Sequence, residues 1–191
     1  LLAWLMADGR WRGLGEVFAR LDGLTLGLAA AGFGLSYLLR ALRIFDEFRA
    51  QAGGRFGTCL RITLIHNAMI NVVPFRGGEA AFPLLLRKNF GVPLPRAIAS
   101  LFWFRLQDAF VVMALAAIVW PGLHPALKAT AVLGVVAIAW WLPRWARAPH
   151  AWADGSGFTA KFAKVRDAFA ESTRHARYGW VWTIANWTVK L

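Results

Sequence analysis

Six polar side chains between residues 67 and 108 stand in sequence that is otherwise apolar enough to lie in a membrane. They are Asn67, Asn71, Arg76, Glu79, Arg105 and Asp108. A charge near the centre of a bilayer costs about 2.5–3.5 kcal/mol on insertion scales, so such groups pair, face a wet cavity or contact a polar substrate. An arginine fork matches phosphate oxygens, and a carboxylate pairs with an amine. The chemistry indicated is therefore recognition of a lipid headgroup.

Arg76 and Glu79 lie at a break in the helical pattern. Pro74 removes a backbone donor, and the pair Gly77-Gly78 permits a tight turn, so these three residues are expected to form a structural hinge. Arg76 is suited to bind a phosphate. Glu79 is suited to pair with Arg76, to accept a headgroup amine or to take up a proton. A local Arg76–Glu79 pair that only neutralises itself is the alternative.

The other four polar residues each have a functional and a structural interpretation. Asn67 and Asn71 are four residues apart, so their amides share one helix face and either contact a headgroup or cap the broken backbone near Pro74. Arg105 and Asp108 are three residues apart on the next predicted helix. They either line a cavity or form a local pair that lowers the cost of insertion.

The elements that must position these residues are membrane helices. The chain has 191 residues, is 58% hydrophobic, and contains 11 Trp and 14 Phe, a composition typical of a polytopic helical membrane protein rather than a soluble domain. Residues 24–45, 97–120 and 123–142 are long enough to cross about 30 Å of hydrocarbon at about 1.5 Å per residue. A fourth run, residues 58–75, is interrupted by polar residues. The predicted fold class is all-α.

The distribution of Lys and Arg predicts the topology. Residues 40–61 hold five, residues 87–96 hold three and residues 143–177 hold seven, while residues 121–124 hold none. The positive-inside rule places the three basic segments on one side. This requires the chain to enter the membrane and return within residues 58–89, as a re-entrant helical hairpin whose broken backbone lines a cavity. An ordinary spanning helix with an external loop is the alternative.

Two basic features flank these spans. Arg40 and Arg43 close the first span and are expected to snorkel to the interface. Apolar residues recur at helical spacing in the last basic segment, and they are Phe158, Phe162, Val165 and Phe169. They predict an amphipathic helix that lies on the cytoplasmic leaflet or packs on neighbouring loops.

Composition also argues against several classes of protein. The net charge of +12 flanks apolar spans, which favours loops beside an anionic leaflet over a nucleic-acid-binding face. One Cys and four scattered His give neither a disulfide framework nor a ligand spacing, so no metal and no cofactor are predicted. The chain lacks a P-loop, an H-E-x-x-H motif and a Ser nucleophile elbow. Residues 1–191 are expected to form one integral membrane domain that is truncated at both ends.

Several of these motifs together resemble a known family. They are His66-Asn67, Asn71-Val72-Val73-Pro74-Phe75-Arg76-Gly77-Gly78-Glu79, Leu84-Leu85-Leu86-Arg87, Phe90-Gly91-Val92-Pro93, and finally Arg105 and Asp108. This pattern resembles the lysylphosphatidylglycerol synthase transmembrane family, also called the flippase-like domain. The earlier run Ser36-Tyr37-Leu38-Leu39-Arg40-Ala41-Leu42-Arg43 resembles the family's first full helix.

The resemblance implies a multi-pass protein of the bacterial inner membrane that moves lipids or lipid-linked headgroups between leaflets. The matching positions are Asn71, Pro74, Arg76, Gly78, Glu79, Arg105 and Asp108. Many members carry a basic residue shortly after the Gly-Glu pair, where this chain has Ala80-Ala81-Phe82-Pro83, and this departure bears on which headgroup fits. The soluble aminoacyl-transferring domain of the synthase is absent from these residues, so synthase activity is not inferred.

The sequence therefore favours a flippase-like protein whose partners are membrane phospholipids or a lipid-linked substrate, and it favours transport over catalysis. Two alternatives stay open. One is a membrane-embedded enzyme that modifies a lipid headgroup, with Glu79 as general base. The other is a non-catalytic scaffold that docks a partner synthase through its basic loops. The sequence does not specify the oligomeric state.

Overall fold

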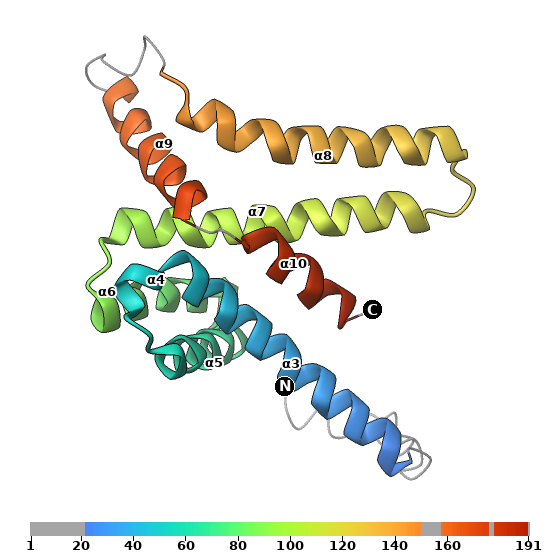
Figure 1. Cartoon of the computed structure of the whole chain (residues 1–191), viewed down its shortest axis with the longest axis horizontal. Helices are drawn as coiled ribbons and strands as arrows, with labels where there is room; N and C mark the ends of the chain where they lie inside the picture. The colour runs from blue at the N-terminus through green and yellow to red at the C-terminus, as the bar shows by residue number, and fades with distance from the viewer. Residues whose placement is uncertain (1–21, 150–157, 176–177, 191) are drawn as a thin grey trace.

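The computed structural model describes residues 22–149, 158–175 and 178–190, and it is 87% helical with no strand in these segments. The side chains of residues 75–76, 158–162 and 175 lie outside this description. Figure 1 shows the helices in order. They are α3 (Gly23–Glu47), α4 (Arg49–Ala52), α5 (Phe56–Val72), the 3-10 helix η2 (Pro74–Ala80), α6 (Ala81–Phe90), α7 (Leu94–Val119), α8 (Pro125–Arg147), α9 (Phe158–His175) and α10 (Gly179–Thr188). The all-α prediction is confirmed.

In the part of the chain that the structure describes, three helices are long and apolar enough to cross a membrane, and they are α3, α7 and α8. They coincide with the predicted runs 24–45, 97–120 and 123–142. Much of their apolar surface faces outward: α8 buries only Pro143 and Ala146, while Leu133 is 68% exposed. Helices this apolar on their outer faces are suited to hydrocarbon rather than water. The chain is an integral membrane protein.

Residues at the helix ends fit their positions. The Asp22 carboxylate accepts a hydrogen bond from the Thr25 amide at 3.0 Å and caps α3, and the hydrogen bonds from Thr25 lower the pKa of this carboxyl. Gly91 ends α6 in the left-handed conformation, with φ of 66°. Gly122 turns the chain between α7 and α8 with φ of 76°, and Pro125 starts α8.

Helices α7 and α8 pack on each other, and α3 packs on α5 and α10. In Figure 1, α7 and α8 run side by side as an antiparallel pair, and α9 crosses both at one end. Helix α10 packs on α3 and α7, and it follows α9 in the chain. The end of α3, the basic end of α8 and the start of α7 gather near α9, at the opposite end of the molecule from the α7–α8 turn (Figure 1).

Helices α5 and α6, joined by η2, form a hairpin. The Arg55 guanidinium lies 5.0 Å from the centroid of the Phe90 ring, so the beginning of α5 meets the end of α6. At the tip, a Cβ on Gly78 would lie 2.1 Å from the Met69 carbonyl oxygen. Neither Gly77 nor Gly78 has a positive φ, and Gly78 is needed because η2 packs directly on the backbone of α5. That the glycine pair permits the tight turn stays a prediction.

Two apolar clusters hold these layers together. One joins α3, α5, α6 and α7, and includes Ile44, Phe48, Ile62, Phe82, Leu86 and Phe104. The other joins α7, α8 and α9, and includes Trp103, Phe110, Ala146 and Phe169. Helix α9 therefore packs against other helices, with Phe169 buried and Val165 exposed. Of the two predictions for this segment, packing on neighbouring parts of the chain describes the contacts of α9.

Candidate functional site

A pocket of about 60 Å³ lies between α3, α5, α6 and α7, and we call it the polar pocket. Its lining residues are Arg40, Arg43, Ile44, Thr63, His66, Asn67, Phe82, Leu101, Phe104, Arg105 and Asp108. Three of the six predicted site residues, Asn67, Arg105 and Asp108, are therefore brought together here from two helices. Arg40 and Arg43 join them from α3.

Arg43 and Asp108 form an ion pair across the bundle, between α3 and α7. Arg43 Nη1 donates to Asp108 Oδ1 at 3.1 Å, and Arg43 Nη2 donates to the Phe104 carbonyl at 2.7 Å and to Gln107 Oε1 at 2.8 Å. Arg43 is only 6% exposed. The prediction that Arg43 snorkels to the interface is wrong, because these three acceptors on α7 hold its guanidinium inside the bundle.

Glu79 pairs with Arg105 and so ties the hairpin to α7. Arg105 Nη2 lies 3.2 Å from Glu79 Oε1, and these side chains are 43% and 29% exposed. The interpretation of Arg105 and Asp108 as a local pair is thus corrected. Each finds its partner on another element, Arg105 on η2 and Asp108 on α3. The Arg76 side chain lies outside the described residues, and so does its predicted contact.

Arg40 links α3 to α5 through a neutral partner. Arg40 Nη1 donates to Asn67 Oδ1 at 2.6 Å, while Asn67 Nδ2 donates to the Thr63 carbonyl at 2.8 Å. The capping interpretation is wrong for Asn67, because its amide donates one turn back along α5 and not to the backbone near Pro74. Both functional groups of the Asn67 amide therefore serve to hold Arg40 at the edge of the pocket.

A larger cavity of about 520 Å³ adjoins the polar pocket, and we call it the amphipathic groove. It shares Arg40 and Asn67 with the polar pocket and is also lined by Leu28, Ala29, Gly32, Phe33, Ser36, Tyr37, Asn71, Val189 and Lys190. Asn71, the fourth predicted site residue, lies here. The groove therefore offers polar groups where it meets the pocket and apolar side chains along the outer part of α3.

Several residues at this site were not among those predicted. Gln107 accepts from Arg43, Trp187 Nε1 donates to Asp108 Oδ1 at 3.3 Å, and Ser36 donates to Asn186 at 2.7 Å. The available signal was a polar stripe on one face of α3, at residues 36, 40, 43 and 47, which recur at helical spacing. Gln107 and Trp187 carry no comparable signal, because their roles depend on contacts between helices.

A second polar cluster lies where α3, α7 and α9 meet. Glu47 Oε1 accepts hydrogen bonds from Ser100 at 2.5 Å and from Ser172 at 2.6 Å, and Glu47 is 1% exposed. Nearby, Arg96 pairs with Glu171 at 3.1 Å. Among the residues that the structure describes, no three His, Cys, Asp or Glu side chains gather closely enough to hold a metal ion.

Comparison with known proteins gives one match. A family model described as the lysylphosphatidylglycerol synthase TM region matches residues 1–191, the whole chain. No curated protein and no solved structure matches the chain.

Proposed function

Because the chain belongs to the lysylphosphatidylglycerol synthase TM region family, we propose that it moves the headgroup of a phospholipid or lipid-linked substrate between leaflets. The headgroup passes through the polar pocket, and the acyl chains stay in the amphipathic groove and the surrounding bilayer. This places the protein in the bacterial inner membrane as a multi-pass protein. The predicted site residues Asn67, Asn71, Arg105 and Asp108 line this path, and Glu79 pairs with Arg105 at its edge.

One observation carries the proposal: charges of both signs line a cavity inside an otherwise apolar bundle, and this cavity opens into an amphipathic groove. The pairs Arg43–Asp108 and Arg105–Glu79 each join two elements. Residues charged at such depth are expensive to insert, which favours a functional role for them. A headgroup can replace the partners in the partly exposed Arg105–Glu79 pair one at a time, so that neither charge is left unsatisfied during passage.

The charge balance favours a headgroup that bears phosphate. Asp108 and Glu79 are matched by Arg43 and Arg105, whereas Arg40 is held by a neutral amide. The Lys190 ammonium lies 4.8 Å from the Trp187 ring centroid, on the wall of the same groove. In the described part of the chain, the groove and pocket thus carry an excess of positive charge.

The hairpin is proposed to be re-entrant. Its two ends meet through Arg55 and Phe90, so its flanking basic segments lie on one side of the molecule. Non-helical backbone at membrane depth is tolerated only against protein or a wet cavity. Packing of η2 on α5, with Glu79 directed to Arg105 beside the pocket, satisfies this requirement.

The test is translocation of fluorescent phospholipids in proteoliposomes, with and without an imposed proton gradient. Glu79→Gln removes a charge at the pocket edge and is expected to reduce the rate at least tenfold. Glu171→Gln is the matched control, because Glu171 also pairs with an arginine but lies at the α7–α9 contact. Equal rates for wild type and Glu79→Gln would show that the path is assigned wrongly. Absence of translocation by folded wild-type protein would favour the enzyme or the scaffold.

A further inference from the structure

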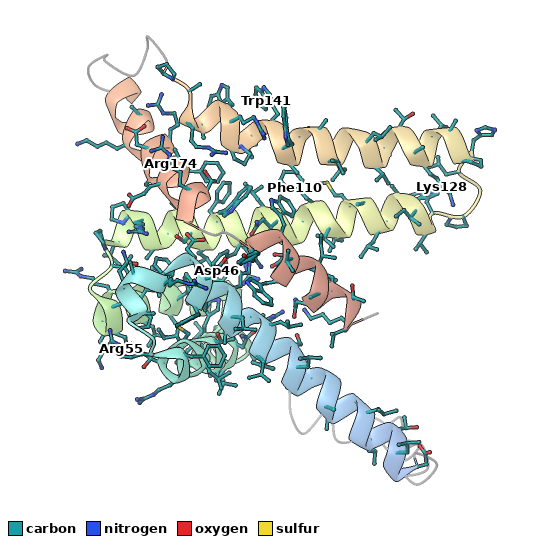
Figure 2. All side chains as sticks on the ribbon, in the orientation of Figure 1. Asp46, Arg55, Phe110, Lys128, Trp141 and Arg174 are labelled. Atoms are coloured by element: carbon teal, nitrogen blue, oxygen red, sulfur yellow. The ribbon has the colours of Figure 1, made fainter. Side chains whose placement is uncertain are left out.

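An apolar cavity that the translocation path does not use lies between α7, α8 and α10, and we call it the apolar slot. It has a volume of about 380 Å³. Its lining includes Phe110, Ala114, Leu115, Val136, Ala139 and Ile184. Figure 2 shows Phe110 on α7, pointing into the space beside α8. Every lining side chain of the slot is hydrophobic, so its natural content is hydrocarbon.

The slot continues into a second cavity with a different character, which we call the basic mouth. This cavity of about 160 Å³ shares Ala139, Trp140 and Trp180 with the slot. Its remaining lining includes Arg144 and Arg147, which stand in the last turn of α8. The two cavities together therefore form one continuous site, cationic at the basic end of the molecule and apolar toward the middle of the bundle.

Both arginines of the basic mouth keep hydrogen-bond donors available. Arg144 Nη1 donates to the Trp140 carbonyl at 3.1 Å, and its guanidinium lies 3.5 Å from the Trp140 ring centroid. Arg147 Nε donates to the Pro143 carbonyl at 2.8 Å. In the segments that the structure describes, neither arginine forms an ion pair with a carboxylate. Two guanidinium groups thus face the mouth without a paired carboxylate among the described residues.

We propose that this site holds a resident anionic phospholipid. Its phosphate lies between Arg144 and Arg147, where guanidinium donors match phosphate oxygens, and one acyl chain fills the apolar slot. Trp140 stands at the junction, the level at which tryptophan is favoured in membranes. Charge complementarity selects this occupant over a zwitterionic lipid, whose ammonium group offsets the charge of its phosphate, and over a second apolar helix, which brings no phosphate to the two arginines. The site is separate from the polar pocket and does not depend on translocation.

The experiment measures lipid binding to the detergent-solubilised protein by native mass spectrometry and by thermal shift. Dioleoyl phosphatidylglycerol is compared with dioleoyl phosphatidylcholine and with inorganic phosphate. We expect the anionic lipid to bind at least tenfold more tightly than the neutral one and to raise the melting temperature, while inorganic phosphate has no effect. Equal binding of the two lipids, or equal protection by inorganic phosphate, would overturn the proposal.

Two variants separate the parts of the site. Arg144→Gln with Arg147→Gln should weaken binding of the anionic lipid about tenfold and leave the neutral lipid unchanged. Ala114→Trp fills the slot without altering charge and should weaken both lipids. The control is Arg61→Gln with Arg87→Gln, which removes two exposed arginines that line neither cavity.

Circular dichroism and melting without added lipid establish that each variant is folded. Unchanged lipid binding in both folded variants would refute the site. A change in oligomeric state with Ala114→Trp, with lipid binding unaffected, would instead assign the slot to a second copy of the chain.

Discussion

At the residue scale, the charged side chains act between helices and not within them. Arg43 reaches Asp108 across 65 positions of sequence, and Glu79 reaches Arg105 on the next long helix. The two pairs differ in environment, because the Arg43 side chain is almost fully buried whereas both members of the other pair are partly open. One pair is thus suited to hold the bundle together, and the other is suited to exchange partners.

This difference in exposure predicts that two substitutions, each of which removes one negative charge, destabilise the protein by different amounts. Asp108→Asn leaves Arg43 buried without its counter-charge and should lower the free energy of unfolding by about 3 kcal/mol. Glu79→Gln breaks a partly exposed pair and should cost about 0–1 kcal/mol. Unfolding in detergent, followed by circular dichroism, measures both variants. A loss for Glu79→Gln as large as that for Asp108→Asn would contradict the distinction.

Gly78 provides a second prediction at this scale. Gly78→Ala places a methyl group 2.1 Å from the Met69 carbonyl, so the tip must shift, at a cost of about 1–3 kcal/mol. Gly134→Ala is the control, because a Cβ there has no atom within 4 Å. We expect a lower melting temperature for the first variant and no decrease for the second. Equal melting temperatures would show that η2 relaxes without cost.

At the element scale, the spanning helices were predictable from the sequence and the polar contacts were not. Hydropathy is a local property, so the predicted run 24–45 matches α3 within two residues at each end. Asn67 and Arg105 were identified because charged and amide groups are conspicuous in apolar sequence. Their partners depend on how α3, α5 and η2 pack, which no spacing along one helix records. The wrong interpretations of Arg43, of Asn67 and of a local Arg105–Asp108 pair all came from considering one helix alone.

The re-entrant hairpin predicts which residues share a side of the membrane. Single cysteines at Ala50, before the hairpin, and at Lys88, in its last turn, should react with an impermeant maleimide from one side. A cysteine at His124, in the α7–α8 turn, should react from the other. Native Cys59 is fully buried and gives little background. Labelling of Ala50→Cys and Lys88→Cys from opposite sides, with His124→Cys reacting from the side of Ala50→Cys, would mean that the hairpin region crosses the membrane.

At the scale of the whole molecule, segments far apart in the chain are joined at buried polar points. Glu47 and Ser172 are 125 residues apart, and their hydrogen bond fixes α9 against α3 and α7. Trp187 and Asn186 do the same for α10, through Asp108 and Ser36. The three spanning helices have large exposed apolar faces, which do not fix where α9 and α10 pack. The buried hydrogen bonds therefore set the positions of α9 and α10 on the spanning helices. Apolar packing against lipid and apolar packing against protein are close in energy, which makes such bonds decisive.

Removal of the donors at Glu47 tests this role. Ser100→Ala with Ser172→Ala leaves a buried carboxylate without either hydroxyl and should lower the free energy of unfolding by about 1–3 kcal/mol. It should also speed hydrogen exchange in α9. The control, Thr130→Ala with Thr188→Ala, removes two exposed hydroxyls that bond within their own helices and should have little effect. Identical exchange in α9 for both double variants would argue against the proposed link.

The contact at Gly78 also determines how the protein can move. Because the contact between Gly78 and the Met69 backbone leaves no room for a Cβ atom, η2 and α5 must move together as one rigid unit. Two polar contacts join this unit to its neighbours: Arg40–Asn67 to α3 and Arg105–Glu79 to α7. Water can replace either partner in these contacts. The pocket is therefore expected to open where the hairpin meets α3 and α7, by exchange of these polar partners. The contact at Gly78 prevents opening between η2 and α5.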